Sequence, residues 1–176
     1  MAAASEQFEL PFQWDDGRFI SPFVSTGDSA VVELVRVLEE HQLTGGGNTM
    51  VDLGCGDGKV LLGAASKLPS LRCIGFDLDE ELVERANSKG ASLPNAGFQT
   101  LDIVDAPLSA FGQPSVVFMY LLPEALEALR PKIEELFRAP STKLLVSNMW
   151  PVEYLKDSLV GRRDTLNVYD PKVIPK

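Results

Sequence analysis

VDLGCGDGK, residues 51–59, is the stretch of sequence that decides the fold of this chain. The segment 49–53 is typical of a buried strand, and it leads through a glycine-rich turn into a helix predicted to begin near Gly58. Glycines in such a turn let backbone N–H groups approach a ligand closely, and the first helical turn directs unpaired N–H groups at the same spot. A strand, a glycine turn and a helix in this order form the entrance of a nucleotide-type pocket.

Two carboxylates flank this turn and indicate the charge of its ligand. Asp52 precedes the turn and Asp57 lies within it. Carboxylates repel the pyrophosphate of a dinucleotide but attract the ammonium and sulfonium groups of S-adenosylmethionine. The spacing Gly54-x-Gly56-x-Gly58 also differs from the Gly-x-Gly-x-x-Gly pattern of hydride-transfer enzymes. The turn therefore predicts the first motif of a methyltransferase.

Length and composition are those of an ordinary globular domain. The chain has 176 residues, of which 45% are hydrophobic and 23% charged, so one domain with a sizeable core is expected. Its net charge of −9 argues against nucleic acid as the main partner, because binding to a phosphate backbone needs a surplus of Lys and Arg. The charge favours a basic or neutral substrate.

The sequence shows neither a targeting signal nor a metal-ligand pattern. The N-terminus has no basic flank followed by an apolar run, and no stretch approaches the roughly 18 apolar residues of a membrane span. Cys55 and Cys73 are too few for a disulfide framework or a zinc site. We expect both thiols to be buried in a reducing compartment, so a cytoplasmic location, no membrane span and no metal are predicted.

Strands and helices alternate from residue 28 onward, which predicts an α/β fold with a doubly wound, mostly parallel sheet. Residues 1–22 have no clear period and are expected to form an irregular arm before a domain spanning 23–176. The expected helices are 28–43, 58–68, 79–89, 124–130 and 131–137. The expected strands are 49–53, 71–76, 97–101, 115–121 and 143–149, followed by 155–160 and 165–169 as a closing antiparallel pair.

Some helix ends are marked by specific residues. Asp28 or Ser29 is expected to cap the first helix, and glycines 45–47 are expected to end it. Pro123 is expected to open a helix, and Pro131 should divide that helix into two pieces.

The carboxyl ends of the strands carry the candidate pocket residues, because ligands of such sheets bind there. Asp77 lies about 20 residues beyond the glycine turn, where an acid binds a ribose diol, or it caps the next helix. Asp102 is placed to accept from an adenine amine, or it is a solvated strand end. Leu78 and Ile103 would cover the ring faces. Tyr120 lies at the end of the expected strand 115–121 and is either a packed aromatic or a wall of the acceptor site.

Several segments together resemble one family. They are the VDLGCGDGK turn with AAS after it, the strand end GFDLD, and the run YLLPEALEALRPKIEEL. Over residues 23–150 the chain is similar to small seven-stranded S-adenosylmethionine-dependent methyltransferases. That family includes bacterial proteins and the animal mitochondrial lysine methyltransferases that act on the ATP synthase c-subunit and the adenine nucleotide translocase.

The resemblance implies a Rossmann-like seven-stranded fold, with a C-terminal antiparallel hairpin and S-adenosylmethionine converted to S-adenosylhomocysteine. By the same resemblance, the residues that contact the cofactor would be Gly54, Gly56, Gly58, Asp77 and Asp102. The segment Pro22-Phe23-Val24-Ser25-Thr26 departs from the family's Pro-Phe-Val-Pro-Ser/Thr by one proline, and the apolar anchor of the mitochondrial members is not seen.

The acceptor implied by the resemblance is an accessible lysine of a protein substrate. Phe23 and Tyr120 are the expected walls or hydrogen-bond partners of the amine, ahead of Trp150 and Asn148. A small-molecule methyltransferase and a non-catalytic cofactor-binding adaptor are the alternatives. The oligomeric state is not indicated by the sequence.

Overall fold

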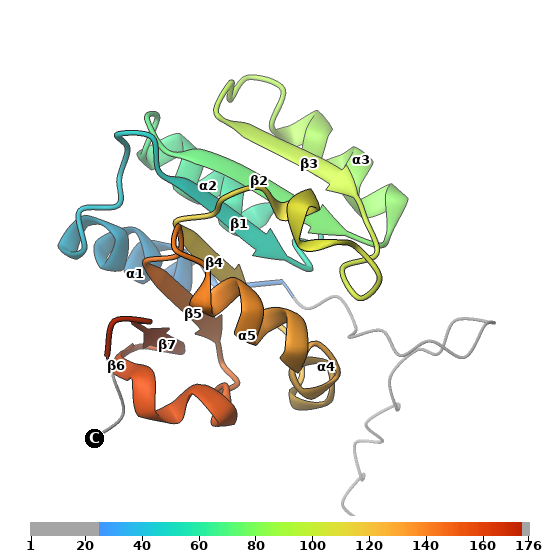
Figure 1. Cartoon of the computed structure of the whole chain (residues 1–176). Coiled ribbons are helices and arrows are strands. Elements are labelled where there is room, and N and C mark those ends of the chain that lie inside the picture. The colour runs from blue at the N-terminus through green and yellow to red at the C-terminus, as the bar shows by residue number, and fades with distance from the viewer. Residues whose placement is uncertain (1–24, 174–176) are drawn as a thin grey trace, which may run out of the picture.

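The computed structural model describes residues 25–173, and its centre is one seven-stranded sheet in the order β3-β2-β1-β4-β5-β7-β6 (Figure 1). Neighbouring strands are parallel from β3 through β5, whereas β7 runs antiparallel to both β5 and β6. The strands are β1 Thr49–Leu53, β2 Arg72–Asp77, β3 Ala96–Thr100, β4 Val116–Met119, β5 Leu144–Asn148, β6 Leu159–Arg163 and β7 Leu166–Tyr169. The predicted doubly wound sheet with an antiparallel C-terminal pair is confirmed. The predicted arm, 1–22, lies outside the described residues.

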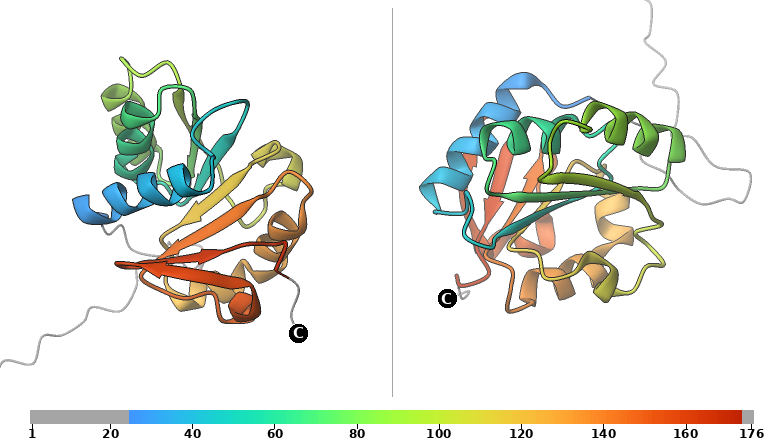
Figure 2. Two further views of the ribbon diagram at one scale, coloured as in Figure 1. Left: turned by 90° about the vertical axis from the view of Figure 1, so that its left-hand side faces the viewer. Right: turned by 90° about the horizontal axis from the view of Figure 1, so that it is seen from above.

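Helices cover both faces of the sheet, α1, α2 and α3 on one side and α4 and α5 on the other (Figure 2). The helices are α1 Asp28–Glu40, α2 Lys59–Lys67, α3 Glu80–Lys89, α4 Pro123–Ala128 and α5 Arg130–Arg138, with the 3-10 helices η1 Leu108–Phe111 and η2 Glu153–Ser158. Every residue of β4 and β5 is buried, because layers of helices lie over both faces of these central strands. None of the helices among residues 25–173 combines the length and apolar character that crossing a bilayer requires.

Two apolar cores hold these layers together. Alternate side chains of β1 point to opposite faces, so Met50 packs with α1, α2 and α3 while Val51 and Leu53 pack with α4 and α5. Asp52 shares the Met50 face of the strand and is therefore directed into the first core. Both cysteines are buried free thiols, as predicted.

The ends of α1 differ from the prediction. Gly27 occupies its N-cap position, and the helix ends at Glu40, before the glycines expected to end it. The two expected capping residues are engaged elsewhere. The Asp28 carboxylate lies 2.9 Å from the Lys59 ammonium, and the Ser29 hydroxyl donates to Asp164 at 3.0 Å. Both side chains therefore contact other elements, α2 and the β6–β7 turn, and α1 begins without a side-chain cap hydrogen bond.

The predicted strand 155–160 is wrong for most of its length. Residues 153–158 form η2, and the edge strand β6 starts at Leu159 and continues to Arg163, beyond the predicted end of the strand at residue 160. A half-exposed edge strand lacks a continuous apolar pattern, so its register could not be found from periodicity. The predicted division near Pro131 is confirmed, although the break falls at Leu129 and the proline lies in the first turn of α5.

Candidate active site

The glycine turn after β1 is fastened to the end of β2. The backbone N–H groups of Gly54 and Cys55 both donate to the Phe76 carbonyl, at 2.8 and 3.0 Å. The N–H of Gly56 donates to Asp77 Oδ2 at 2.7 Å. The turn and the predicted ribose-binding acid therefore form one unit at the carboxyl edge of the sheet.

Gly58 is the position in this turn where a side chain fits least. Its φ is +80°, and a Cβ would lie 2.8 Å from the Phe98 ring and 2.9 Å from the Ala86 Cβ. A left-handed backbone and tight packing thus both require glycine at the N-cap of α2.

Gly58→Ala should therefore lower stability by about 1–3 kcal/mol, because strain and the clash act together. Thermal unfolding would measure the loss. Gly46→Ala is the matched control, since Gly46 also has a positive φ, of +65°, but open space around it. Equal losses in the two variants would contradict the packing argument.

Asp52 carries an unusual buried carboxylate. The residue is 2% exposed, and within the described part of the chain its Oδ1 is buried without a hydrogen-bond partner. Burial, and then the charge of Asp77, raise the pKa of Asp52 well above its usual range. An ionised carboxylate at this position needs a compensating positive charge, and the neighbouring charge that acts on it in the described structure is the negative one of Asp77.

Asp77 ends β2, and its two carboxylate oxygens are both engaged. Oδ2 accepts from Gly56, and Oδ1 accepts from the N–H of Asp79 at 3.0 Å. Burial raises the pKa of Asp77, and the backbone N–H donors oppose that rise. The alternative of a helix cap does not apply to Asp77, because Asp79 caps α3 by accepting from Leu82.

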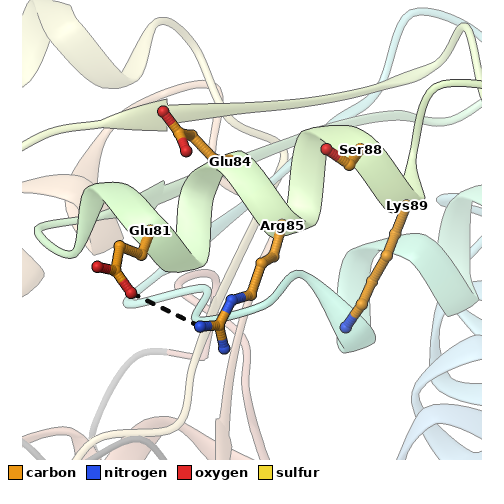
Figure 3. Close-up of a pocket in the computed structure, with 5 residues that line it drawn as sticks. All are labelled: Glu81, Glu84, Arg85, Ser88 and Lys89. Carbon is orange, nitrogen blue, oxygen red and sulfur yellow. Dashed lines mark ion pairs between the residues drawn. The ribbon is translucent and has the colours of Figure 1, made fainter.

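Asp57 lies at the outer side of the turn and forms an ion pair with α3. Lys89 Nζ is 2.5 Å from Asp57 Oδ2. Lys89 also lines a shallow depression on α3, where Glu81 and Arg85 pair at 3.6 Å (Figure 3). The structure thus gives Asp57 a partner within the chain, whereas Oδ1 of Asp52 has none among residues 25–173.

The loop after β3 brings the other predicted cofactor residues to the same edge. Asp102 lies two residues beyond the end of β3, and its Oδ1 accepts from the Val104 N–H at 2.9 Å. The half-buried Ile103 packs against the second core. The Leu101 N–H donates to the Asp77 carbonyl at 2.8 Å, so this loop starts beside the ribose-binding acid. Leu78, also half-buried, directly follows Asp77.

Aromatic and thioether side chains stand at the ends of β4 and β5. Tyr120 is half-buried, and its hydroxyl donates to Met149 Sδ at 3.8 Å. Met149 has a φ of +63°, which non-glycine residues rarely adopt and which often marks functional sites. Its exposed fraction is 49%, and that of Trp150 is 37%. Met149 was not predicted, because a positive φ outside glycine leaves no sequence signal.

Of the remaining candidates, Asn148 is buried and its Oδ1 accepts from the Thr165 hydroxyl at 2.5 Å, which indicates a structural role. Phe23 lies outside the described residues. Within residues 25–173, no three His, Cys, Asp or Glu side chains gather as ligands for a metal ion.

Comparison with known proteins places the chain among methyltransferases. The sequence model of the ANTKMT methyltransferase domain family matches residues 52–158. A protein-lysine N-methyltransferase of Saccharolobus islandicus (strain REY15A) is 26% identical over 132 residues, covering 70% of this chain and 74% of that protein.

Solved structures agree. An RNA methyltransferase from Salinibacter ruber, in complex with S-adenosyl-L-homocysteine, has a TM-score of 0.66 and 25% identity, covering 87% of this chain and 97% of that one. The methyltransferase domain of bacterial CtHen1-C shares the fold, with a TM-score of 0.57 and 20% identity over 73% of this chain and 68% of that one. The predicted Rossmann-like methyltransferase fold is confirmed.

The residues at the carboxyl edge fit S-adenosylmethionine. The cofactor brings an ammonium and a sulfonium, and the buried, unpartnered oxygen of Asp52 suits a cationic ligand. The glycine turn gives backbone access, with positive φ values at Gly54, Gly56 and Gly58. A carboxylate stands at the end of β2 and another in the loop after β3, which suits ribose and adenine.

Proposed function

Since this chain belongs to the ANTKMT methyltransferase domain family and is an S-adenosylmethionine-dependent methyltransferase, we propose that its acceptor is the side-chain amine of a protein lysine. The similarity to a protein-lysine N-methyltransferase along 70% of the chain is the observation that carries this proposal. The acidic balance of the chain, a net charge of −9, is complementary to a basic protein segment.

Different residues would bind different parts of the cofactor. Asp52 and the turn glycines, 54, 56 and 58, would hold its cationic end, with Asp57 contributing to the negative potential at the turn. Asp77 would accept from the ribose hydroxyls. Asp102 would accept from the adenine amine, with Leu78 and Ile103 against the ring. This arrangement follows the order of the strands, because each group is carried by the end of a successive strand.

The chain's contribution to the reaction is mainly positioning. S-adenosylmethionine supplies an electrophilic methyl group on a sulfonium, which a neutral amine displaces in line. The protein must hold the amine against that group and exclude water, and such alignment accounts for roughly 7–11 kcal/mol in well-oriented reactions. Desolvation at an apolar wall also lowers the pKa of a lysine and so favours its neutral form.

We assign that wall to the ends of β4 and β5. Tyr120 would flank the amine, together with Phe23 from the segment that precedes α1 in the sequence. Met149 and Trp150 expose apolar surface on which the aliphatic part of a lysine side chain would pack. The Tyr120 hydroxyl is held by Met149 Sδ, so the two side chains form one surface.

RNA is the second candidate acceptor, favoured by the similarity to the Salinibacter ruber RNA methyltransferase over 87% of the chain. A net charge of −9 opposes it, because neutralising a phosphate backbone requires cationic side chains.

Labelling of a cell extract with tritiated S-adenosylmethionine separates the candidates. The unaltered chain should transfer label to a protein band that protease removes and ribonuclease leaves, and acid hydrolysis should return the label as methyl-lysine. Tyr120→Ala should lower this transfer about tenfold or more while cofactor affinity stays constant, because positioning of the amine is lost. Asp157→Ala, at an exposed position of η2, is the control.

Each other outcome identifies a different function. Ribonuclease-sensitive label would indicate RNA, and label confined to small products would indicate a small-molecule methyltransferase. Cofactor binding without any labelled product would favour an adaptor. Any of these three results contradicts the lysine proposal.

A further inference from the structure

Lys132 of α5 occupies an unusual place in the described structure. Its ammonium donates to three backbone carbonyls of the loop after β3, those of Ile103 at 2.8 Å, Val104 at 2.6 Å and Ala106 at 2.5 Å. An ammonium has three donors, and these three acceptors use all of them. The side chain therefore acts as a cation bound at the centre of a turn.

The turn needs such a cation. The Ala106 N–H donates to the Asp102 carbonyl at 2.9 Å, which curls residues 102–106 so that neighbouring carbonyls face one centre. Converging carbonyl dipoles repel one another unless a positive charge lies between them. Val104, in the middle of the turn, is 55% exposed and adds little apolar packing, whereas Ile103 and Ala106 on either side of it pack against the second core.

The position of Lys132 in its own helix is otherwise unfavourable. It is the third residue of α5, and a cation in the first turn of a helix opposes the helix dipole. The Lys132 ammonium is directed at the carbonyls of the loop after β3. It also lies 5.8 Å from the centroid of the Phe111 ring. Contact with the loop accounts for a lysine here, whereas the helix alone does not.

The same contacts reach two of the acids of the proposed cofactor site, Asp102 and Asp77. Asp102 accepts from Val104 within the turn, and Phe111 packs edge-on against Phe76, which precedes Asp77, with ring centroids 5.3 Å apart. We propose that Lys132 is a positioning residue, which locks the loop after β3 in the shape that presents Asp102 and Ile103 to the adenine ring. This inference rests on the proposed placement of adenine beside these two residues.

The test is a calorimetric titration with S-adenosylhomocysteine and with its inosine analogue, in which a carbonyl replaces the adenine amine. No acceptor is present, so the result is independent of what the enzyme methylates. Lys132→Met keeps an unbranched side chain as far as Cε and removes the ammonium with its charge. We expect about a tenfold weaker affinity for S-adenosylhomocysteine. We also expect the unaltered chain's preference for adenine over hypoxanthine to fall several-fold.

Two further variants complete the test. Lys132→Arg keeps a cation with several donors and should retain most of the preference for adenine over hypoxanthine. If Lys132→Met does not fold, the arginine variant still tests the proposal. Lys143→Met is the matched control, because the Lys143 ammonium bonds Asn48 Oδ1 at 2.8 Å just before the amino end of β5, away from the site. It should leave both affinities unchanged.

A loss of thermal stability in Lys132→Met with an unchanged adenine preference would show a merely structural role and overturn the proposal. So would an arginine variant as weak as the methionine variant. If the unaltered chain does not bind S-adenosylhomocysteine, the cofactor site itself is wrong, which is a different failure from an unaffected Lys132 variant.

Discussion

Asp52→Asn should stabilise the cofactor-free protein and at the same time weaken its binding of S-adenosylmethionine. Asn keeps the shape of the side chain and cannot ionise, whereas Asp52 must either keep a proton or bury a charge with one oxygen unpartnered. An unsatisfied buried polar group costs about 1–3 kcal/mol, and Asn retains a polar amide, so a gain of about 1 kcal/mol is expected. Such a gain raises Tm by about 2–4 °C in a chain of this size.

The sign of the pH dependence follows from the raised pKa of Asp52. Between the ordinary value of about 3.9 and the raised value, the folded chain keeps a proton that the unfolded chain has lost. The contribution of this proton to stability is complete below that window and declines as pH rises through it. The Tm advantage of Asp52→Asn should therefore grow as the pH rises above the ordinary Asp pKa toward the raised value of Asp52.

Cofactor binding should move in the opposite direction. A bound cation stabilises the ionised carboxylate, so the affinity of the unaltered chain should rise over the same pH window. Asp52→Asn should lose about tenfold or more in affinity, since a hydrogen bond to a charged group contributes about 1.5–3 kcal/mol. Asp157→Asn, at an exposed carboxylate of η2, controls for net charge. A variant that is less stable at every pH, with unchanged affinity, would contradict this role of Asp52.

Asp77→Ala should weaken cofactor binding by at least about tenfold, which corresponds to 1.4 kcal/mol. Two effects combine. The variant removes the acceptor proposed for the ribose hydroxyls, and it also releases the Gly56 N–H, which Asp77 Oδ2 holds at 2.7 Å. The glycine turn then loses one of its ties to β2 and keeps those from the Gly54 and Cys55 N–H groups to the Phe76 carbonyl.

Asp77→Asn separates the two effects, because its remaining oxygen can still accept from one backbone donor. We expect affinity between those of Asp77→Ala and the unaltered chain. Asp79→Ala is the matched control, since it removes the neighbouring carboxylate that caps α3 and should lower stability by about 1 kcal/mol without a comparable loss of affinity. An unchanged dissociation constant for Asp77→Ala would remove Asp77 from the site.

The sequence predicted those parts of the molecule in which a local pattern and the tertiary contacts agree. The buried strands β1, β2, β4 and β5 are apolar because both of their faces are covered, and so they were found. The predicted position of Asp77 at the end of β2 is confirmed, because the strand before it and the helix after it are both strongly patterned.

The parts that could not be predicted depend on long-range contacts. The edge strand β6 has an exposed face and no period, so its register was placed wrongly. Lys132 looks like any surface lysine until α5 is placed against the loop after β3. The sequence indicated that Asp52 carries a carboxylate beside the turn. It did not indicate that this carboxylate would be buried with one oxygen unpartnered.

A crystal structure of the chain with S-adenosylhomocysteine is the measurement that most directly tests where the cofactor binds. We predict the ligand at the carboxyl edge of the sheet, with its ribose hydroxyls on Asp77, its adenine beside Asp102 and Ile103, and its amino group toward Asp52. A ligand bound at another face, or one that leaves these carboxylates without contact, would contradict the account.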